Sequence, residues 1–204
     1  MSAREPAIDL TGNVTDFFGN VVADAIRARG YETTEAAETY LVALLADYTR
    51  PDELSDETLS RPLTLLLEEA LHAQGHERFE RLRSVGDGVL YVSGFFADHL
   101  DNRGIQRTYV STLGARAYEN AAAMLRSGDP EASAPDLFAE LSEKFRMFAD
   151  LLADVAETLH ANAPRTDRAT VRLYERWLRT GSSSLAEALS ARGLTPMRGR
   201  GLVH

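Results

Sequence analysis

Two short motifs, each with a glutamate three residues before a histidine, are the first residues in this chain that could do chemistry. They are Glu69-Ala-Leu-His72 and Glu157-Thr-Leu-His160. Residues three apart lie on the same face of a helix, so the carboxylate and the imidazole of one motif could contact one ion. Glu38 and Glu119 precede the two motifs in turn, and helical bundles that hold two iron or manganese ions use this order of ligands.

Helical periodicity predicts which way these side chains point, and the prediction argues against a metal site. The apolar stripe within 63–70 marks the inward face of its helix, which turns Glu69 and His72 to the opposite side. Glu157 likewise lies opposite the apolar stripe of its own helix, and only His160 falls near a buried edge. We therefore predict no metal and no other cofactor, and keep a ferritin-like di-metal protein as a remote alternative.

A second group of polar residues is predicted on the inward face of one helix. Arg116 and Asn120 share that face with Tyr109 and Thr112, and polar groups placed there must find partners. An antiparallel turn about residue 103 would bring Ser93 level with Thr112. The same turn would place an acidic residue, at position 87, within one helical turn of Arg116.

This predicted cluster has two interpretations, and the sequence leaves both open. Its members are Ser93, Tyr109, Thr112, Arg116 and Asn120. As a site, it would bind a small polar or anionic ligand, with Arg116 as a bidentate donor and the hydroxyl groups as further contacts. As part of the fold, it would be a buried network whose polar groups are all hydrogen-bonded, or an arginine whose guanidinium reaches the solvent at the edge of the core.

The elements that must position these groups are predicted to be helices throughout. Apolar residues recur at helical spacing, with capping residues and helix-ending glycines or prolines between the runs. The expected helices are 13–29, 34–48, 60–75, 76–100, 106–126, 135–159, 167–178 and 185–192. We predict an all-α, single-domain helical bundle of about seven or eight helices over residues 1–194, followed by a mobile tail at 195–204.

The segment 76–100 is the most ambiguous element, because it contains Gly86, Gly88 and Gly94. A strand at 89–92 is the competing prediction, since a short apolar run does not by itself distinguish a strand from a buried helix. We favour one long central helix that forms a hairpin with 106–126. Gly86 and Gly94 would then allow a neighbouring backbone to approach closely, or would mark a kink.

Composition limits the classes of partner. The 204 residues include no cysteine, carry a formal net charge of −9 and contain no apolar run long enough to span a bilayer. Lack of cysteine excludes disulfides and thiolate chemistry, and the acidic balance disfavours a nucleic-acid partner. The first ten residues do not read as a signal peptide. We expect a cytoplasmic protein that binds neither membrane nor nucleic acid.

Two segments carry a resemblance to a known family. They are the run 85–96, Val-Gly-Asp-Gly-Val-Leu-Tyr-Val-Ser-Gly-Phe-Phe, and the run 173–181, Leu-Tyr-Glu-Arg-Trp-Leu-Arg-Thr-Gly. With these segments the chain resembles a family of all-helical bacterial proteins that has no assigned activity. The resemblance implies a bacterial helical protein and brings no cofactor or reaction with it.

Two functions are therefore predicted. The first is a helical interaction or regulatory protein that self-associates through its glycine-containing helix, as a homodimer or with another helical protein. The alternative is a protein or enzyme that binds a small polar or anionic ligand in a pocket around Arg116. No nucleophile with an adjacent base stands out in the sequence, so we assign no catalytic residue and leave open whether the chain is an enzyme.

Overall fold

The structure, a computed structural model, describes residues 10–48, 61–97, 100, 105–128, 137–161 and 167–196. Every regular element in these ranges is a helix, which confirms the prediction of an all-α bundle. The helices are α1 (Leu10–Arg29), α2 (Glu35–Asp47), α4 (Leu63–His72), α5 (Gly75–Phe95), α7 (Arg107–Gly128), α8 (Leu137–Glu143), α9 (Phe145–Ala161), α10 (Asp167–Thr180) and α11 (Ser183–Ser190). No helix among them is both long enough and apolar enough to cross a membrane.

The chain divides into two compact units, and the boundary falls within α9. Unit 1 covers Met1–Ala153 and unit 2 covers Asp154–His204. The single domain expected over residues 1–194 stays a prediction. Most of the expected mobile tail, residues 197–204, lies outside the described residues. The two units are described separately below.

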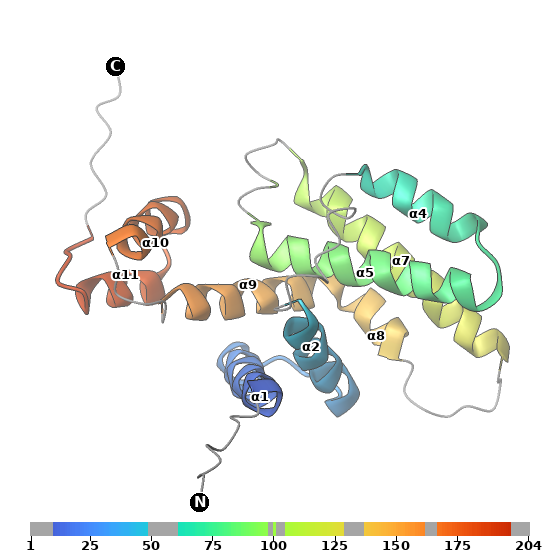
Figure 1. Ribbon diagram of the computed structural model, residues 1–204, viewed down its shortest axis with the longest axis horizontal. Coiled ribbons are helices and arrows are strands. Elements are labelled where there is room, and N and C mark those ends of the chain that lie inside the picture. Colours follow the sequence, from blue (N-terminus) through green and yellow to red (C-terminus); the bar gives the residue numbers. More distant parts are fainter. Residues whose placement is uncertain are drawn as a thin grey trace, which may run out of the picture. The chain divides into compact units, whose positions relative to one another are not determined.

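Unit 1 is built around the antiparallel pair α5 and α7, with α4 packed against both helices (Figure 1). Helix α5 is continuous from Gly75 to Phe95, so the long helix is confirmed and the strand at 89–92 is wrong. Its glycines explain the ambiguity of the sequence. A methyl group added at Gly86 would overlap the Tyr118 ring, and one added at Gly94 would overlap Leu152. Close packing within unit 1, and not a strand, requires these glycines.

The link between α1 and α2 follows the signals that the sequence contains. Gly30 has a φ of 64° after the last residue of α1, a left-handed conformation that favours glycine at the end of a helix. Thr34 caps α2, because its hydroxyl accepts a hydrogen bond from the backbone N–H of Ala37 at 3.2 Å. These residues confirm the predicted limits of the first two helices.

One predicted helix is wrong, since the segment expected as a single helix over 135–159 is two. Helix α8 ends at Glu143 and α9 begins at Phe145, with Lys144 between them in a turn. Backbone hydrogen bonds run through this turn, from Lys144 N to Glu140 O at 2.9 Å and from Phe148 N to Lys144 O at 3.0 Å. The break interrupts helical geometry without interrupting the apolar stripe, so periodicity alone did not reveal it.

Unit 2 contains the end of α9 together with α10 and α11. Its core is formed by Leu173, Trp177, Leu185 and Leu189. The Ser182 hydroxyl donates to Glu157 at 2.7 Å, and the Arg192 guanidinium donates to the carbonyl of Ala161 at 3.0 Å. These contacts hold the end of α9 against α10 and α11 within the unit.

Candidate functional site

The five residues predicted to form one ligand pocket do not lie together. Tyr109 is 49% exposed, Thr112 and Arg116 are exposed, and Asn120 is half-buried. The face of α7 that is buried instead carries Val110, Leu113, Gly114, Ala117, Tyr118 and Ala121. The inward orientation predicted for Arg116 and its neighbours is therefore wrong. Small residues allow α7 to approach α5 closely, and the prediction gave too much weight to the larger Tyr109.

Two of the five residues, Arg116 and Asn120, line a groove of about 450 Å³ between α4 and α7. Leu67 and Leu71 of α4 and Glu119 of α7 also line it. The Asn120 side chain donates to the carbonyl of Arg116 at 2.8 Å, one turn earlier in the same helix. Arg116 makes no ion pair with any described residue. A ligand at this arginine remains a prediction, in a setting different from the expected one.

A buried polar cluster lies elsewhere in unit 1, around Asp87 of α5. Both the Tyr40 hydroxyl of α2 and the Tyr118 hydroxyl of α7 donate to Asp87 Oδ1, at 2.6 and 2.7 Å. The Asp87 side chain is 17% exposed, and its other oxygen lies 3.9 Å from Arg83 Nε. Sequence reasoning placed this carboxylate beside Arg116 and missed both tyrosines. The signal for Tyr118 was its place on the small-residue face of α7.

Burial is the main cause of the shifted pKa values in this cluster. It raises the pKa of Asp87 from 3.8 to about 6, although hydrogen bonds from Tyr40 and Tyr118 and the charge of Arg83 act in the other direction. Burial and the nearby Asp87 carboxylate also raise the pKa values of both tyrosines. The two hydroxyls therefore remain protonated donors, and the cluster joins α2, α5 and α7.

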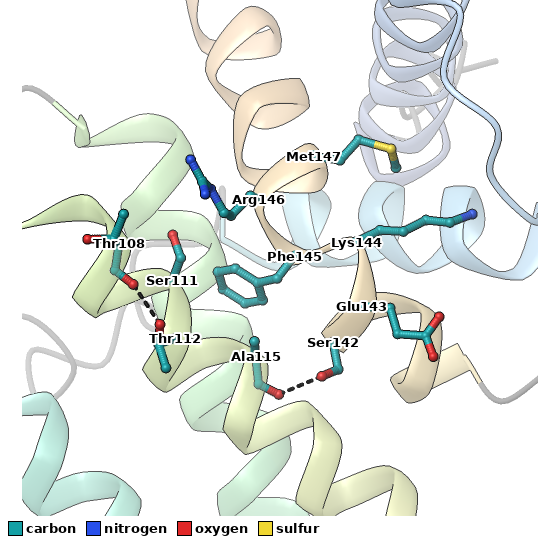
Figure 2. A pocket seen from close by; sticks show the side chains of 10 residues that line it. All are labelled: Thr108, Ser111, Thr112, Ala115, Ser142, Glu143, Lys144, Phe145, Arg146 and Met147. Carbon is teal, nitrogen blue, oxygen red and sulfur yellow. Dashed lines mark hydrogen bonds between the residues drawn. The ribbon is translucent and has the colours of Figure 1, made fainter.

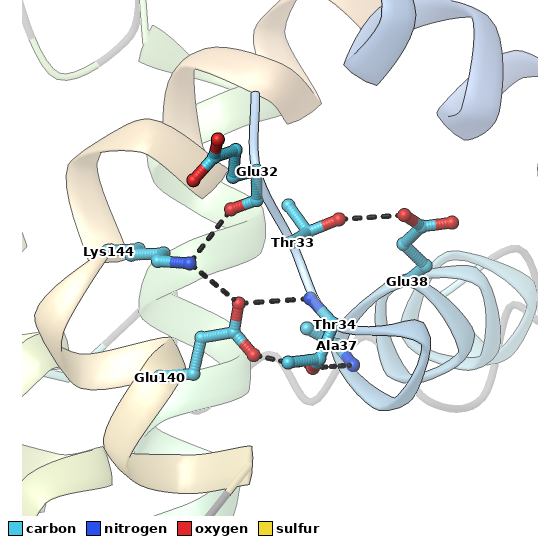
Figure 3. A network of polar contacts seen from close by, with 7 residues as sticks. All are labelled: Glu32, Thr33, Thr34, Ala37, Glu38, Glu140 and Lys144. Atoms are coloured by element: carbon cyan, nitrogen blue, oxygen red, sulfur yellow. Dashed lines mark hydrogen bonds and ion pairs between the residues drawn. The ribbon is translucent and has the colours of Figure 1, made fainter. Parts of the chain in front are cut away.

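A second network joins α8 to the start of α2 (Figure 3). The Glu140 carboxylate accepts hydrogen bonds from the Thr34 hydroxyl at 2.5 Å, the Thr34 backbone N–H at 3.2 Å and Lys144 Nζ at 3.0 Å. Lys144 Nζ also donates to the carbonyl of Glu32 at 2.8 Å. Burial raises the pKa of Glu140, but these hydrogen bonds outweigh it and leave the pKa below its usual value. Lys144, the chain's single lysine, is thus committed to structure.

The Glu-x-x-His residues face outward or make contacts within the fold. Glu69 is paired with Arg61, and this contact lowers the pKa of its carboxyl group. His72 is exposed and its Nδ1 lies 2.8 Å from the carbonyl of Glu68. His160 of unit 2 is also exposed. Across the described ranges, no three histidine, aspartate or glutamate side chains come close enough together to hold a metal ion.

Besides the α4–α7 groove, another groove of about 420 Å³ lies between α7 and the α8–α9 turn (Figure 2). Helix α7 contributes Thr108, Ser111, Thr112 and Ala115, and the turn and its flanks contribute Ser142, Glu143, Lys144, Phe145, Arg146 and Met147. Figure 2 shows Arg146 extending toward Thr108 and Ser111, while the Lys144 side chain points away from α7. The groove is therefore rich in hydroxyl groups and has Arg146 at one end.

A smaller pocket of about 80 Å³ adjoins this groove and shares Thr108, Ser111 and Arg146 with it. Its other lining residues are Ser93, Leu100, Arg107, Ala149 and Asp150. Ser93 Oγ is buried from solvent and has no hydrogen-bond partner among the described residues. A buried hydroxyl without a partner is uncommon in a folded protein, because leaving it unsatisfied costs about 1–3 kcal/mol.

The start of α7 and the side chain of Arg146 bring positive charge to this small pocket. The first intrahelical hydrogen bonds run from Tyr109 N and Val110 N to the carbonyl of Gln106, so the N-terminal end of α7 lies at the pocket. Arg146 makes no ion pair or hydrogen bond with the described residues, although Asp150 follows one turn later. Among the described residues, the charged side chains that line the pocket are those of Arg107, Arg146 and Asp150. This arrangement can hold an oxyanion.

No protein-family model, curated protein or solved structure matches this chain. The resemblance of 85–96 and 173–181 to a bacterial family stays a prediction. We therefore infer function from the groove and the pocket beside α7.

Proposed function

We propose that this protein binds a small ligand through a tetrahedral oxyanion, of the phosphate type, in the pocket between α5, α7 and α9. The observation that carries the proposal is the buried Ser93 hydroxyl, which has no hydrogen-bond partner among the described residues. Arg146, which makes no ion pair with a described residue, lines the same pocket. An oxyanion at this position would accept a hydrogen bond from the Ser93 hydroxyl and form an ion pair with the Arg146 guanidinium.

The pocket supplies several kinds of hydrogen-bond donor that stabilise an oxyanion. Arg146 offers a planar guanidinium that can give two parallel hydrogen bonds to one oxyanion. Ser93 and Ser111 supply hydroxyl donors, and the start of α7 supplies the positive end of a helix dipole. These are the groups that proteins use for phosphate, so the proposal replaces the predicted Arg116 with Arg146 as the main cation.

Asp150 is the acidic side chain that opposes an anion among the described residues of the pocket. Its carboxylate is exposed, and its repulsion is reduced by solvent and by salt. We expect Asp150→Asn to bind phosphate more tightly than the native chain. A pocket with no role in anion binding would show no gain from this change.

Isothermal titration with inorganic phosphate, supported by thermal unfolding, tests the proposal on the full chain. Binding to the native state raises the unfolding temperature by mass action. Arg146→Gln removes the charge and keeps much of the side-chain length. We expect it to weaken phosphate binding by about 10- to 100-fold, because a hydrogen bond to a charged group contributes about 1.5–3 kcal/mol.

Arg116→Gln is the matched control, since Arg116 is also exposed, lies in unit 1 and makes no ion pair with a described residue, but lines the α4–α7 groove. It should leave phosphate binding unchanged. Loss of binding with Arg116→Gln and not with Arg146→Gln would reject the proposed site in favour of the groove at Arg116. An unchanged titration with both variants would reject both arginines.

Self-association stays a prediction that packing within unit 1 does not favour. The glycine-lined faces of α5, from which it was predicted, contact Tyr118 of α7 and Leu152 of α9 in the same chain. We propose a cytoplasmic location on composition alone. Light scattering over a range of protein concentrations would measure the oligomeric state directly.

A further inference from the structure

We infer that the ligand is a phosphate ester whose body carries hydroxyl groups, with the phosphate in the small pocket and the body along α7 in the larger groove. This inference rests on the proposed oxyanion site and assigns the class of ligand. It follows from the way that hydrogen-bond donors and acceptors are separated along the groove.

The two hollows adjoin each other but differ in size. They share Thr108, Ser111 and Arg146, and their volumes are about 80 and about 420 Å³. A water molecule occupies about 30 Å³ in the liquid, so the smaller hollow has room for little more than a single oxyanion group. A ligand that contacts both hollows must extend beyond its oxyanion.

The larger groove contains groups that accept hydrogen bonds, along α7 and at its far end. The Thr112 hydroxyl donates its proton to the carbonyl of Thr108 at 2.8 Å, and the Ser142 hydroxyl donates its proton to the carbonyl of Ala115 at 2.9 Å (Figure 2). Each hydroxyl oxygen therefore has only lone pairs left to offer a ligand. Glu143, which lies beside Ser142 at the end away from Arg146, also accepts hydrogen bonds.

The groove thus has donors at one end and acceptors at the other. Arg146, Ser93 and Ser111 form the donor end, and Ser142 and Glu143 form the acceptor end. Thr112 is a further acceptor, which lies on α7 beside Thr108 and Ser111. A complementary ligand has an oxyanion at one end and hydrogen-bond donors at the other. The acceptor end disfavours an apolar body, because polar groups would lose water without gaining a partner, and Glu143 disfavours a second anionic group.

Titrations with four small compounds on the full chain test this inference. They are inorganic phosphate, methyl phosphate, glycerol 3-phosphate and phosphoethanolamine. Methyl phosphate has the oxyanion without donors on its body, so we expect glycerol 3-phosphate to bind about tenfold more tightly than methyl phosphate, a difference that one or two neutral hydrogen bonds supply. Phosphoethanolamine presents an ammonium group to the acceptor end. Comparing it with glycerol 3-phosphate shows whether that end prefers a positive charge or hydroxyl groups.

Thr112→Val and Ser142→Ala remove the acceptor hydroxyls, and Val has nearly the shape of Thr. We expect both variants to weaken glycerol 3-phosphate about threefold to tenfold and to leave methyl phosphate unchanged. The methyl phosphate titration also shows that each variant is folded with its oxyanion pocket intact. Tighter binding of phosphoethanolamine than of glycerol 3-phosphate, lost in Glu143→Gln, would overturn the assignment of hydroxyl groups.

The outcomes distinguish the inference from the proposed function. Equal affinity for methyl phosphate and glycerol 3-phosphate overturns the inference and leaves the oxyanion site standing. No binding of any of the four compounds overturns the oxyanion site as well as the inference.

Discussion

Replacing Asp87 by asparagine should change how the stability of this protein depends on pH. Asp87 accepts hydrogen bonds from Tyr40 and Tyr118 through one oxygen, and asparagine keeps that acceptor. Asparagine has no proton to lose. The variant therefore preserves the hydrogen bonds that connect α2, α5 and α7 and removes only the buried charge.

The sign and the size follow from the pKa of Asp87, which burial raises from 3.8 to about 6. Because the folded state holds its proton more tightly than the unfolded chain, the stability from this group is complete below the unfolded pKa. It is lost as the pH rises through the folded pKa. A shift of about two units corresponds to about 3 kcal/mol of unfolding free energy, since each unit is about 1.4 kcal/mol.

Urea unfolding of the native chain and Asp87→Asn, from about pH 4 to about pH 7.5, measures this effect. The variant should match the native chain near pH 4 and be more stable by up to about 3 kcal/mol above pH 7. Other titrating groups cancel in the difference between the two curves. The charged groups that face Asp87 are Arg83 and Glu80 of α5, and both remain in the variant.

Tyr40→Phe is the control for this prediction. It removes one of the two hydrogen bonds that favour the charged carboxylate, so it should move the midpoint of the native transition to higher pH. Two parallel stability curves for the native chain and Asp87→Asn would refute the reasoning, because they would show that Asp87 titrates alike in the folded and unfolded states.

Two further stability predictions follow from packing and from the network of Figure 3. Gly114→Ala should destabilise unit 1 by about 1–3 kcal/mol, because its methyl group would overlap the Phe145 ring, whereas Gly19→Ala in α1 meets no atom within 4 Å and should stabilise by about 0.5–1 kcal/mol. Thermal unfolding of both variants measures this, and equal shifts would contradict the packing. Glu140→Gln should cost about 1.5–3 kcal/mol at pH 7, because its carboxylate is 11% exposed and accepts charge-assisted hydrogen bonds. This loss should shrink as the pH falls through the lowered pKa of Glu140, whereas the effect of Asp87→Asn grows as the pH rises. Glu77→Gln is the control, because Glu77 belongs to an exposed ion pair, and it should cost under about 0.5 kcal/mol.

Helical periodicity and capping residues predicted the elements well, because they depend on neighbours along the chain. The apolar spacing, Gly30 and Thr34 fixed most helix limits. The break at Lys144 escaped prediction, since the apolar stripe continues across it and the cause lies in contacts with Glu32 and Glu140. The contact with Glu32 joins residues 112 positions apart in sequence.

The candidate site was less predictable, because it depends on how helices rotate against each other. The size of Tyr109 suggested an inward face for Arg116, whereas Gly114 and Ala117 in fact set the contact with the neighbouring helices. Ser93 was identified as a site residue, and it does line the proposed pocket. Arg146 was missed, since an arginine on the charged face of an amphipathic helix gives no local signal of what lies opposite.

The central claim is that an oxyanion binds between Ser93 and Arg146. Crystals of the full chain grown with tungstate, a tetrahedral oxyanion that scatters X-rays anomalously, would locate the site without any assumption about the natural ligand. The account predicts an anomalous peak within hydrogen-bond reach of Ser93 Oγ and the Arg146 guanidinium. A peak beside Arg116 alone, or an empty pocket at saturating tungstate, would contradict it.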